Sequence, residues 1–232
     1  MLIKDRGITG SIHGIVHLLA IEFYALSERR FDRHFNIDTS AIVRIEHYDD
    51  LDDQKKSSAV RYQATPIKAL KIILQALDID HPKYTFIDFG SGKGRVLLFA
   101  SEYPFKRIIG VELSQHLHHI AQTNFRNWRN PKQRCYNLES ICLDACDFRI
   151  PDDPLVLFFF TPFSASILEK VIENVDDSLT KNSRPVHIIY FGSNQDLIDV
   201  FKTLSFSYRQ IMEPLPFLNY GAFLFSSSAK GQ

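Results

Sequence analysis

The segment from Phe86 to Arg95 constrains the fold of this chain more than any other. A short apolar run ends at Asp88 and Phe89, three glycines follow at alternate positions, and a new apolar segment begins at Val96. This order predicts a buried strand, a tight turn and the start of a helix. Glycines suit such a turn because its backbone takes angles that other residues avoid, and because they let a ligand approach the bare backbone closely.

Strand-like and helix-like segments alternate along the rest of the chain. The expected strands cover residues 84–89, 107–112, 138–143, 155–160, 186–191, 208–212 and 221–226. The expected helices cover residues 67–77, 95–102, 115–128, 164–179 and 195–204. Such alternation with short loops is typical of an α/β fold whose mostly parallel sheet is covered on both faces. The last two strands are too close in sequence for a helical crossover, so we expect a Rossmann-like, doubly wound sheet of seven strands with a C-terminal antiparallel hairpin.

The first 62 residues follow a different pattern. Apolar residues between Ile15 and Leu26 fall at helical spacing, which predicts an amphipathic helix packed on the domain, and a charged stretch follows over residues 29–34. This helix is too short to span a bilayer, and a helix lying on a membrane surface is the alternative. We expect a helical extension over residues 1–62 that forms a lid or substrate platform, and a ligand-binding domain over residues 63–232.

Composition narrows the classes of function. The formal net charge of the 232 residues is zero, so no global basic field indicates nucleic acid or an anionic membrane as the partner. The three cysteines, Cys135, Cys142 and Cys146, form no Cys-x-x-Cys pair, which argues against both a disulfide framework and a zinc site. We therefore expect a cytoplasmic protein with no bound metal.

Three nucleotide-binding patterns compete for the glycine-rich stretch. The P-loop pattern fails twice, because Ile87 stands where its first glycine belongs and Gly94 stands where its Ser or Thr belongs. The dinucleotide pattern is weak, because Arg95 occupies the position of its third glycine. The pattern acidic-x-Gly-x-Gly-x-Gly matches at every defined position.

On this motif, the chain resembles the class I S-adenosylmethionine-dependent methyltransferases over most of residues 62–226. The resemblance implies that S-adenosylmethionine is the cofactor and that residues 63–232 form its binding domain. It places the cofactor's methionine and ribose over the glycine stretch, where Asp88 lies near the ammonium group. Glu112, at the end of the second expected strand, would accept the ribose hydroxyls. The site residues implied here are Asp88, Gly90, Ser91, Gly92, Gly94 and Glu112.

Further positions match the family's pattern. Asp144 and Ala145 follow the third expected strand, where the family typically binds adenine, and Asp147 is the alternative if the register differs. The fourth strand is followed by Thr161, Pro162 and Phe163, the candidates on the acceptor side. Amine-directed members often have Asn or Asp at the first of these positions. A threonine there has a shorter reach, which puts amine specificity in doubt.

The segment before the first helix of the domain is similar to Tyr-x-x-Thr/Ser-Pro segments of small bacterial lysine-methyltransferase-like members. The resemblance implies that Tyr62 and Thr65 touch the cofactor, and the alternative for Thr65 is a helix cap. Methyl transfer is the expected function; the sequence does not identify the acceptor, and a protein lysine or another amine is one candidate. A non-catalytic cofactor-binding module and an RNA methyltransferase are the alternatives. A protein or small-molecule acceptor is favoured over RNA, and the sequence leaves the oligomeric state open.

A last feature of the sequence is a basic cluster formed by Arg126, Arg129, Lys132 and Arg134. A solvated edge of the domain is the expected role. A contact with RNA or with an acidic protein is the alternative.

Overall fold

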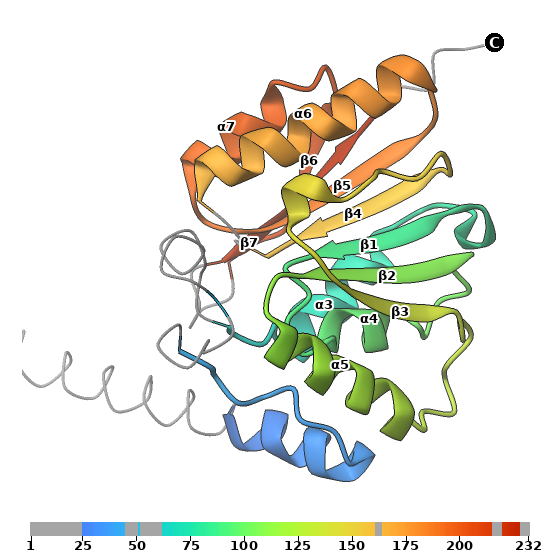
Figure 1. Ribbon diagram of the computed structural model, residues 1–232, viewed down its shortest axis with the longest axis vertical. Coiled ribbons are helices and arrows are strands. Elements are labelled where there is room, and N and C mark those ends of the chain that lie inside the picture. Colours follow the sequence, from blue (N-terminus) through green and yellow to red (C-terminus); the bar gives the residue numbers. More distant parts are fainter. Residues whose placement is uncertain (1–24, 45–50, 52–61, 161–163, 215–219, 228–232) are drawn as a thin grey trace, which may run out of the picture.

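A seven-stranded sheet with helices on both faces forms the centre of the protein (Figure 1). The computed structural model describes residues 25–44, 51, 62–160, 164–214 and 220–227. The strands are β1 (Thr85–Phe89), β2 (Arg107–Glu112), β3 (Leu138–Cys142), β4 (Leu155–Phe159), β5 (Val186–Gly192), β6 (Ser207–Met212) and β7 (Gly221–Ser226). The helices are α3 (Ile67–Gln75), α4 (Arg95–Ala100), α5 (Gln115–Asn127), α6 (Ala165–Lys181) and α7 (Gln195–Lys202), with 3₁₀ turns η2 (His81–Lys83) and η3 (Ala145–Asp147).

The strand order is β3-β2-β1-β4-β5-β7-β6. The first five strands in this order are parallel, and β7 is antiparallel to both β5 and β6. The expected doubly wound sheet with its C-terminal hairpin is therefore confirmed. Because the chain runs outward from β1 to β3 and then returns to β4, the order reverses between β1 and β4. Ligands of open α/β sheets bind beyond the carboxyl ends of the strands at such a point.

Strands β1 and β4 are buried along their whole length because helices cover both faces of the sheet. Helices α3, α4 and α5 lie on one face, and α6 and α7 lie on the other (Figure 1). The side chains of β1 alternate between the two cores, with Phe86 packed toward α3 and α4, and Ile87 packed toward α6. Among the described residues, no helix is both long enough and apolar enough to cross a membrane.

The chain that precedes the sheet packs beside α4 and α5. Residues 25–35 form a helix, so the charged stretch over residues 29–34 is helical. Phe31 stacks on Phe99 of α4 at 5.2 Å between ring centroids, and Phe35 lies 4.5 Å from Trp128 at the end of α5. Most of the predicted helix over residues 15–26 lies outside the described residues. We call residues 25–44 the N-terminal segment.

Candidate functional site

The glycine turn, residues 90–94, lies between the carboxyl end of β1 and the start of α4. Gly90, Gly92 and Gly94 have φ angles of 76°, 54° and 80°, a region that residues with a Cβ rarely adopt. The amides of Gly90 and Ser91 both donate to the carbonyl of Val111, at 2.9 and 3.2 Å. These bonds tie the turn to the end of β2, so the predicted cofactor loop and the predicted ribose-binding residue are adjacent.

Glu112, the last residue of β2, lies against this turn. Its carboxylate accepts hydrogen bonds from the Gly92 amide at 2.7 Å and from the Ser114 amide at 2.9 Å. Ser114 in turn caps α5 by accepting from the Leu117 amide. The side chain that the sequence assigned to ribose binding therefore stands between the glycine turn and the first turn of α5.

Asp88 is a buried carboxyl group on β1, and only 3% of its surface is exposed. Within the described part of the chain, no donor forms a hydrogen bond with its side chain. Burial and the nearby charge of Glu112 raise the pKa of Asp88 well above its ordinary value. Two carboxyl groups at the sheet edge, one of them without a donor, form a site that a cationic group would stabilise.

Asp144 and Ala145 lie beyond the next strand at the same edge of the sheet. Glu112 pairs with Cys142 at the carboxyl ends of β2 and β3, so Asp144 lies two residues after the position on β3 that is opposite Glu112. Its side chain accepts from the Cys146 amide at 2.9 Å and caps η3, while Ala145 is buried. Asp147 is exposed on the far end of that 3₁₀ turn. The Asp144 side chain is thus half-buried beside the strand end, whereas that of Asp147 faces solvent.

Tyr62 lies directly on the glycine turn. A Cβ placed on Gly92 would lie 2.3 Å from two carbons of the Tyr62 ring, so only glycine leaves room for this contact. The phenol donates to the carbonyl of Thr39 at 2.7 Å. Burial, with the charges of Asp32 and Asp38, raises the pKa of this phenol well above its ordinary value. The tyrosine therefore stays neutral, and its ring forms one wall of the site.

Thr65 is buried near Tyr62, but its side chain does not cap α3. The N-cap of that helix is Pro66, without a side-chain bond, so the alternative role as a cap is wrong. Glu28 of the N-terminal segment instead accepts from the first helical amide, that of Ile67, at 3.4 Å. The carbonyl of Thr65 accepts from Arg95 at 3.4 Å.

Ser91 lies in the glycine turn with its side chain packed against β2. Its hydroxyl is buried beneath the turn, where a Cβ on Gly110 of β2 would lie 2.5 Å from it. No partner for this hydroxyl is present among the described residues. The glycine at position 110 thus provides the space in which the turn rests on the sheet.

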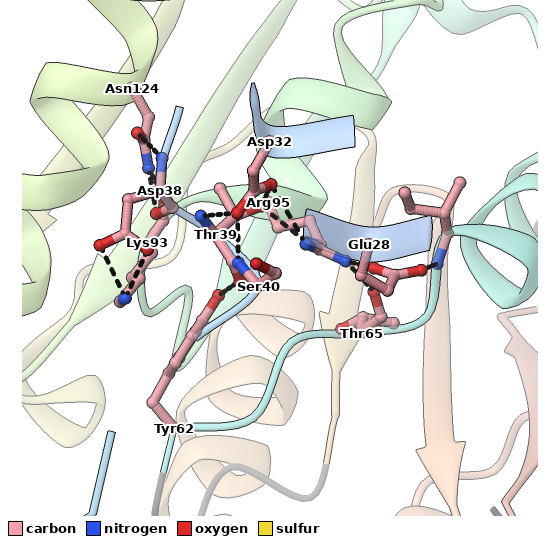
Figure 2. Close-up of polar contacts among 11 residues, drawn as sticks. Glu28, Asp32, Asp38, Thr39, Ser40, Tyr62, Thr65, Lys93, Arg95 and Asn124 are labelled. Atoms are coloured by element: carbon pink, nitrogen blue, oxygen red, sulfur yellow. Dashed lines mark hydrogen bonds and ion pairs between the residues drawn. The ribbon is translucent and has the colours of Figure 1, made fainter. Parts of the chain in front are cut away.

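Lys93 and Arg95 are the residues of this site that the sequence did not assign (Figure 2). Both lie in or beside the glycine turn, and both are about 2% exposed. The Lys93 ammonium group donates to both carboxylate oxygens of Asp38, at 2.8 and 2.9 Å. Asn124 of α5 joins the two, because its side-chain amide donates to the carbonyls of Asp38 and Lys93.

Arg95 forms a second, more deeply buried link to the N-terminal segment. Its guanidinium group is paired with Glu28 and lies 3.4 Å from Asp32, and its Nε donates to the Thr39 hydroxyl at 2.8 Å (Figure 2). Asp32 also accepts from the amides of Thr39 and Ser40, each at 2.6 Å. The cations of the glycine turn are therefore directed at the N-terminal segment and hold it beside the site.

Helical spacing in the sequence contains a signal for this contact. Glu28, Phe31, Asp32 and Phe35 recur at intervals of three and four residues, so they share one face of the helix. That face is half apolar and half acidic, and it therefore requires buried cations as partners.

The acceptor candidates Thr161, Pro162 and Phe163 lie outside the described residues. Phe160, just before them, packs against Phe191 and Tyr220 at 4.8 and 5.6 Å between ring centroids.

Comparison with solved structures identifies this architecture. A magnesium protoporphyrin IX methyltransferase from Synechocystis PCC 6803, solved with bound S-adenosylmethionine, superposes with a TM-score of 0.53 at 13% identity, over 69% of this chain and 79% of that one. The chain has the class I S-adenosylmethionine-dependent methyltransferase fold. An RNA methyltransferase from Salinibacter ruber, in complex with S-adenosyl-L-homocysteine, matches this fold with a TM-score of 0.51 at 15% identity, over 72% and 95% of the two chains.

Other comparisons agree with the methyltransferase fold. The precorrin-6y C5,15-methyltransferase of Geobacter metallireducens has a TM-score of 0.50 at 16% identity, over 71% and 88% of the two chains. The family model of the histone methylation protein DOT1 matches residues 40–146, which span the glycine turn, β2 and β3. No curated protein matches the sequence.

Proposed function

We propose that this protein binds S-adenosylmethionine at the glycine turn and transfers its methyl group to an acceptor. The buried carboxyl group of Asp88, which lacks a hydrogen-bond donor in the described part of the chain, is the observation that supports this most directly. The cofactor carries an ammonium group that would compensate this carboxylate, whereas a dinucleotide carries a pyrophosphate that would be repelled by it. Glu112 and Asp144, at the ends of the next two strands, fit the ribose and the adenine amine.

When bound, the cofactor would supply an electrophilic methyl group: a bond forms from the acceptor to the methyl carbon, the carbon–sulfonium bond breaks, and the sulfur is left as a neutral thioether. The protein's task is consequently to align the acceptor and to exclude water. The glycine turn and Tyr62 offer a close-fitting wall for the donor side. Lys93 and Arg95 keep the N-terminal segment, residues 25–44, beside that wall. This supports the proposal that the extension over residues 1–62 acts as a lid or substrate platform.

For the acceptor, we propose an amine, with a protein lysine as the first candidate. The matched family model bears the name of a histone methylation protein, which supports a protein acceptor. The Salinibacter structure is of an RNA methyltransferase, which supports RNA as the second candidate. Methyl transfer from tritiated cofactor into a cell lysate, followed by separate protease and ribonuclease treatment, distinguishes the two. Binding of the cofactor without transfer to any component would instead support a non-catalytic binding module.

Calorimetric titration with S-adenosyl-L-homocysteine and S-adenosylmethionine tests the donor site. Glu112→Gln and Asp144→Asn each remove a charged acceptor while keeping the side-chain volume. Since hydrogen bonds to charged groups contribute about 1.5–3 kcal/mol, each variant should bind about 10- to 100-fold more weakly.

Matched controls are available on the same strands and turns. Glu139→Gln changes an exposed carboxylate of β3, and Asp147→Asn changes the exposed carboxylate three residues after Asp144. Both controls should bind like the wild type. Wild-type affinity in both site variants would reject the assignment of the site, and loss of binding in Asp147→Asn but not in Asp144→Asn would shift the adenine contact to Asp147.

A further inference from the structure

The surface formed by α5 and the loop that follows it carries basic but no acidic side chains. Although the whole chain has equal numbers of acidic and basic residues, residues 113–138 contain no Asp or Glu. Arg126, Arg129, Lys132 and Arg134 lie within this stretch, and all four side chains are exposed. We call these four residues the basic edge.

None of these four cations is neutralised within the described part of the chain. The nearest partners of Arg126 and Arg129 are the hydroxyl of Thr123 and the carbonyl of Trp128, each at 2.8 Å. Among the described ion pairs, none includes a residue of the basic edge. Arg126 is favoured at the carboxyl end of α5 by the helix dipole, but the other three lie beyond the helix, where the dipole does not explain them.

A groove beside α5 is linked to both the basic edge and the glycine turn, because Thr123 in its lining accepts from Arg126 at 2.8 Å and Asn124 in its lining donates to the carbonyl of Lys93 at 2.9 Å. It has a volume of about 530 Å³ and lies between residues 36–38 and one side of α5. The helix lines it with His116, His119, Ile120, Thr123, Asn124 and Asn127. The hydroxyl and amide groups among these side chains are typical partners of phosphate and sugar oxygens. The one carboxylate of the groove, Asp38, is paired with Lys93, whose backbone lies in the glycine turn.

An exposed aromatic side chain completes this surface. Tyr136 follows Arg134 by two residues, and 78% of it is exposed, the highest value among the large hydrophobic residues of the described chain. Its hydroxyl donates to the carbonyl of Gln133, which leaves the ring open to solvent. An open ring beside cations offers a stacking platform for a base, which an acidic peptide would not use.

We propose that the basic edge, Tyr136 and the α5 groove bind a single-stranded nucleic acid, whose backbone lies along α5 and leads toward the glycine turn. Charge complementarity with phosphates and the stacking platform identify this partner in preference to an acidic protein. The contact does not depend on the bound cofactor or on methyl transfer. Its test can fail while the proposed function holds, and the reverse is also true.

Fluorescence anisotropy with a labelled single-stranded RNA of about 20 nucleotides and the full chain tests the proposal. Four phosphate contacts predict a slope of about −3 for log K against log salt, or about 50-fold weaker binding at 200 mM than at 50 mM salt. The quadruple variant with Arg126→Gln, Arg129→Gln, Lys132→Gln and Arg134→Gln should bind about tenfold or more weakly at 50 mM salt, with a flatter slope. Tyr136→Ala should bind about fivefold or more weakly.

The matched control removes the same charge from other surfaces, with Lys68→Gln, Lys71→Gln, Lys170→Gln and Lys181→Gln on α3 and α6, where all four lysines are exposed. Its affinity should stay within about twofold of the wild type. Circular dichroism establishes that each variant folds. The proposal is overturned if the wild type does not bind the RNA, if the control loses as much affinity as the basic-edge variant, or if Tyr136→Ala binds normally and a polyglutamate peptide competes as well as unlabelled RNA.

Discussion

Replacing Arg95 should release the N-terminal segment from the site. Its guanidinium group is buried between Glu28 and Asp32, whose side chains are each 8% exposed. Arg95→Met fills a similar volume without a charge, so both carboxylates lose their cation. Asp32 keeps the amides of Thr39 and Ser40, whereas among the described residues Glu28 keeps only the long hydrogen bond from the Ile67 amide.

The expected loss of stability follows from the Glu28 carboxylate that Arg95→Met leaves without its cation. Removing one partner of a buried pair leaves an uncompensated charge, at a cost of about 3–5 kcal/mol. The free energy of unfolding of a domain is about 5–15 kcal/mol, so this cost is a large part of its stability. Adding Glu28→Gln to Arg95→Met removes the stranded charge, and the double variant should therefore be less destabilised than the sum of the single variants by about 1–3 kcal/mol.

The only tryptophan of the chain makes the assay specific. Trp128 is 2% exposed and packs against Phe31 and Phe35 of the N-terminal segment, so its fluorescence reports whether that segment is docked. In urea titrations of Arg95→Met, the fluorescence transition should move to lower denaturant than the far-ultraviolet circular dichroism transition of the sheet.

The control for this experiment is Arg107→Met. Arg107 is one-third exposed and lies 3.8–3.9 Å from its acidic partners, so its loss should cost less than about 1 kcal/mol. If Arg95→Met lost no more stability than this control, or if its cost and that of Glu28→Gln were simply additive, the argument that Arg95 holds the segment would be refuted.

Two other variants test the site itself. Asp88→Asn should raise the melting temperature of the ligand-free protein at pH 8 more than at pH 5, because the raised pKa of Asp88 means that its ionisation destabilises the fold increasingly as pH rises above the ordinary value of 3.8. The same variant should lose affinity for S-adenosylmethionine, and a melting temperature at pH 8 below that of the wild type would contradict the prediction. Gly92→Ala should lower stability by about 1–2 kcal/mol through its positive φ alone, and by more through the clash with Tyr62. Thermal unfolding of Gly92→Ala with and without Tyr62→Ala separates the two effects, since only the clash is relieved in the double variant.

Most of the fold could be predicted from local sequence patterns. Strands β2 and β7 have the predicted limits, and each of the other strands differs by one residue at one end. Continuous apolar runs mark strands that are covered on both faces, and the hairpin follows from the short connection before β7. The residues of the glycine turn could be assigned because a turn of this kind depends on glycines close together in the sequence.

Local patterns in the sequence were therefore enough to predict the sheet, the position of the glycine turn at a strand end, and the acidic residues at the carboxyl ends of the first three strands, because each of these depends on residues that are near one another in the chain. Only the tertiary structure determined how the N-terminal segment meets them. Arg95 and Glu28 are separated by 67 positions. In the sequence, neither differs from a charged residue on the protein surface, because only folding buries both. A buried charge has to find an opposite charge, and the three-dimensional packing decides which one it is.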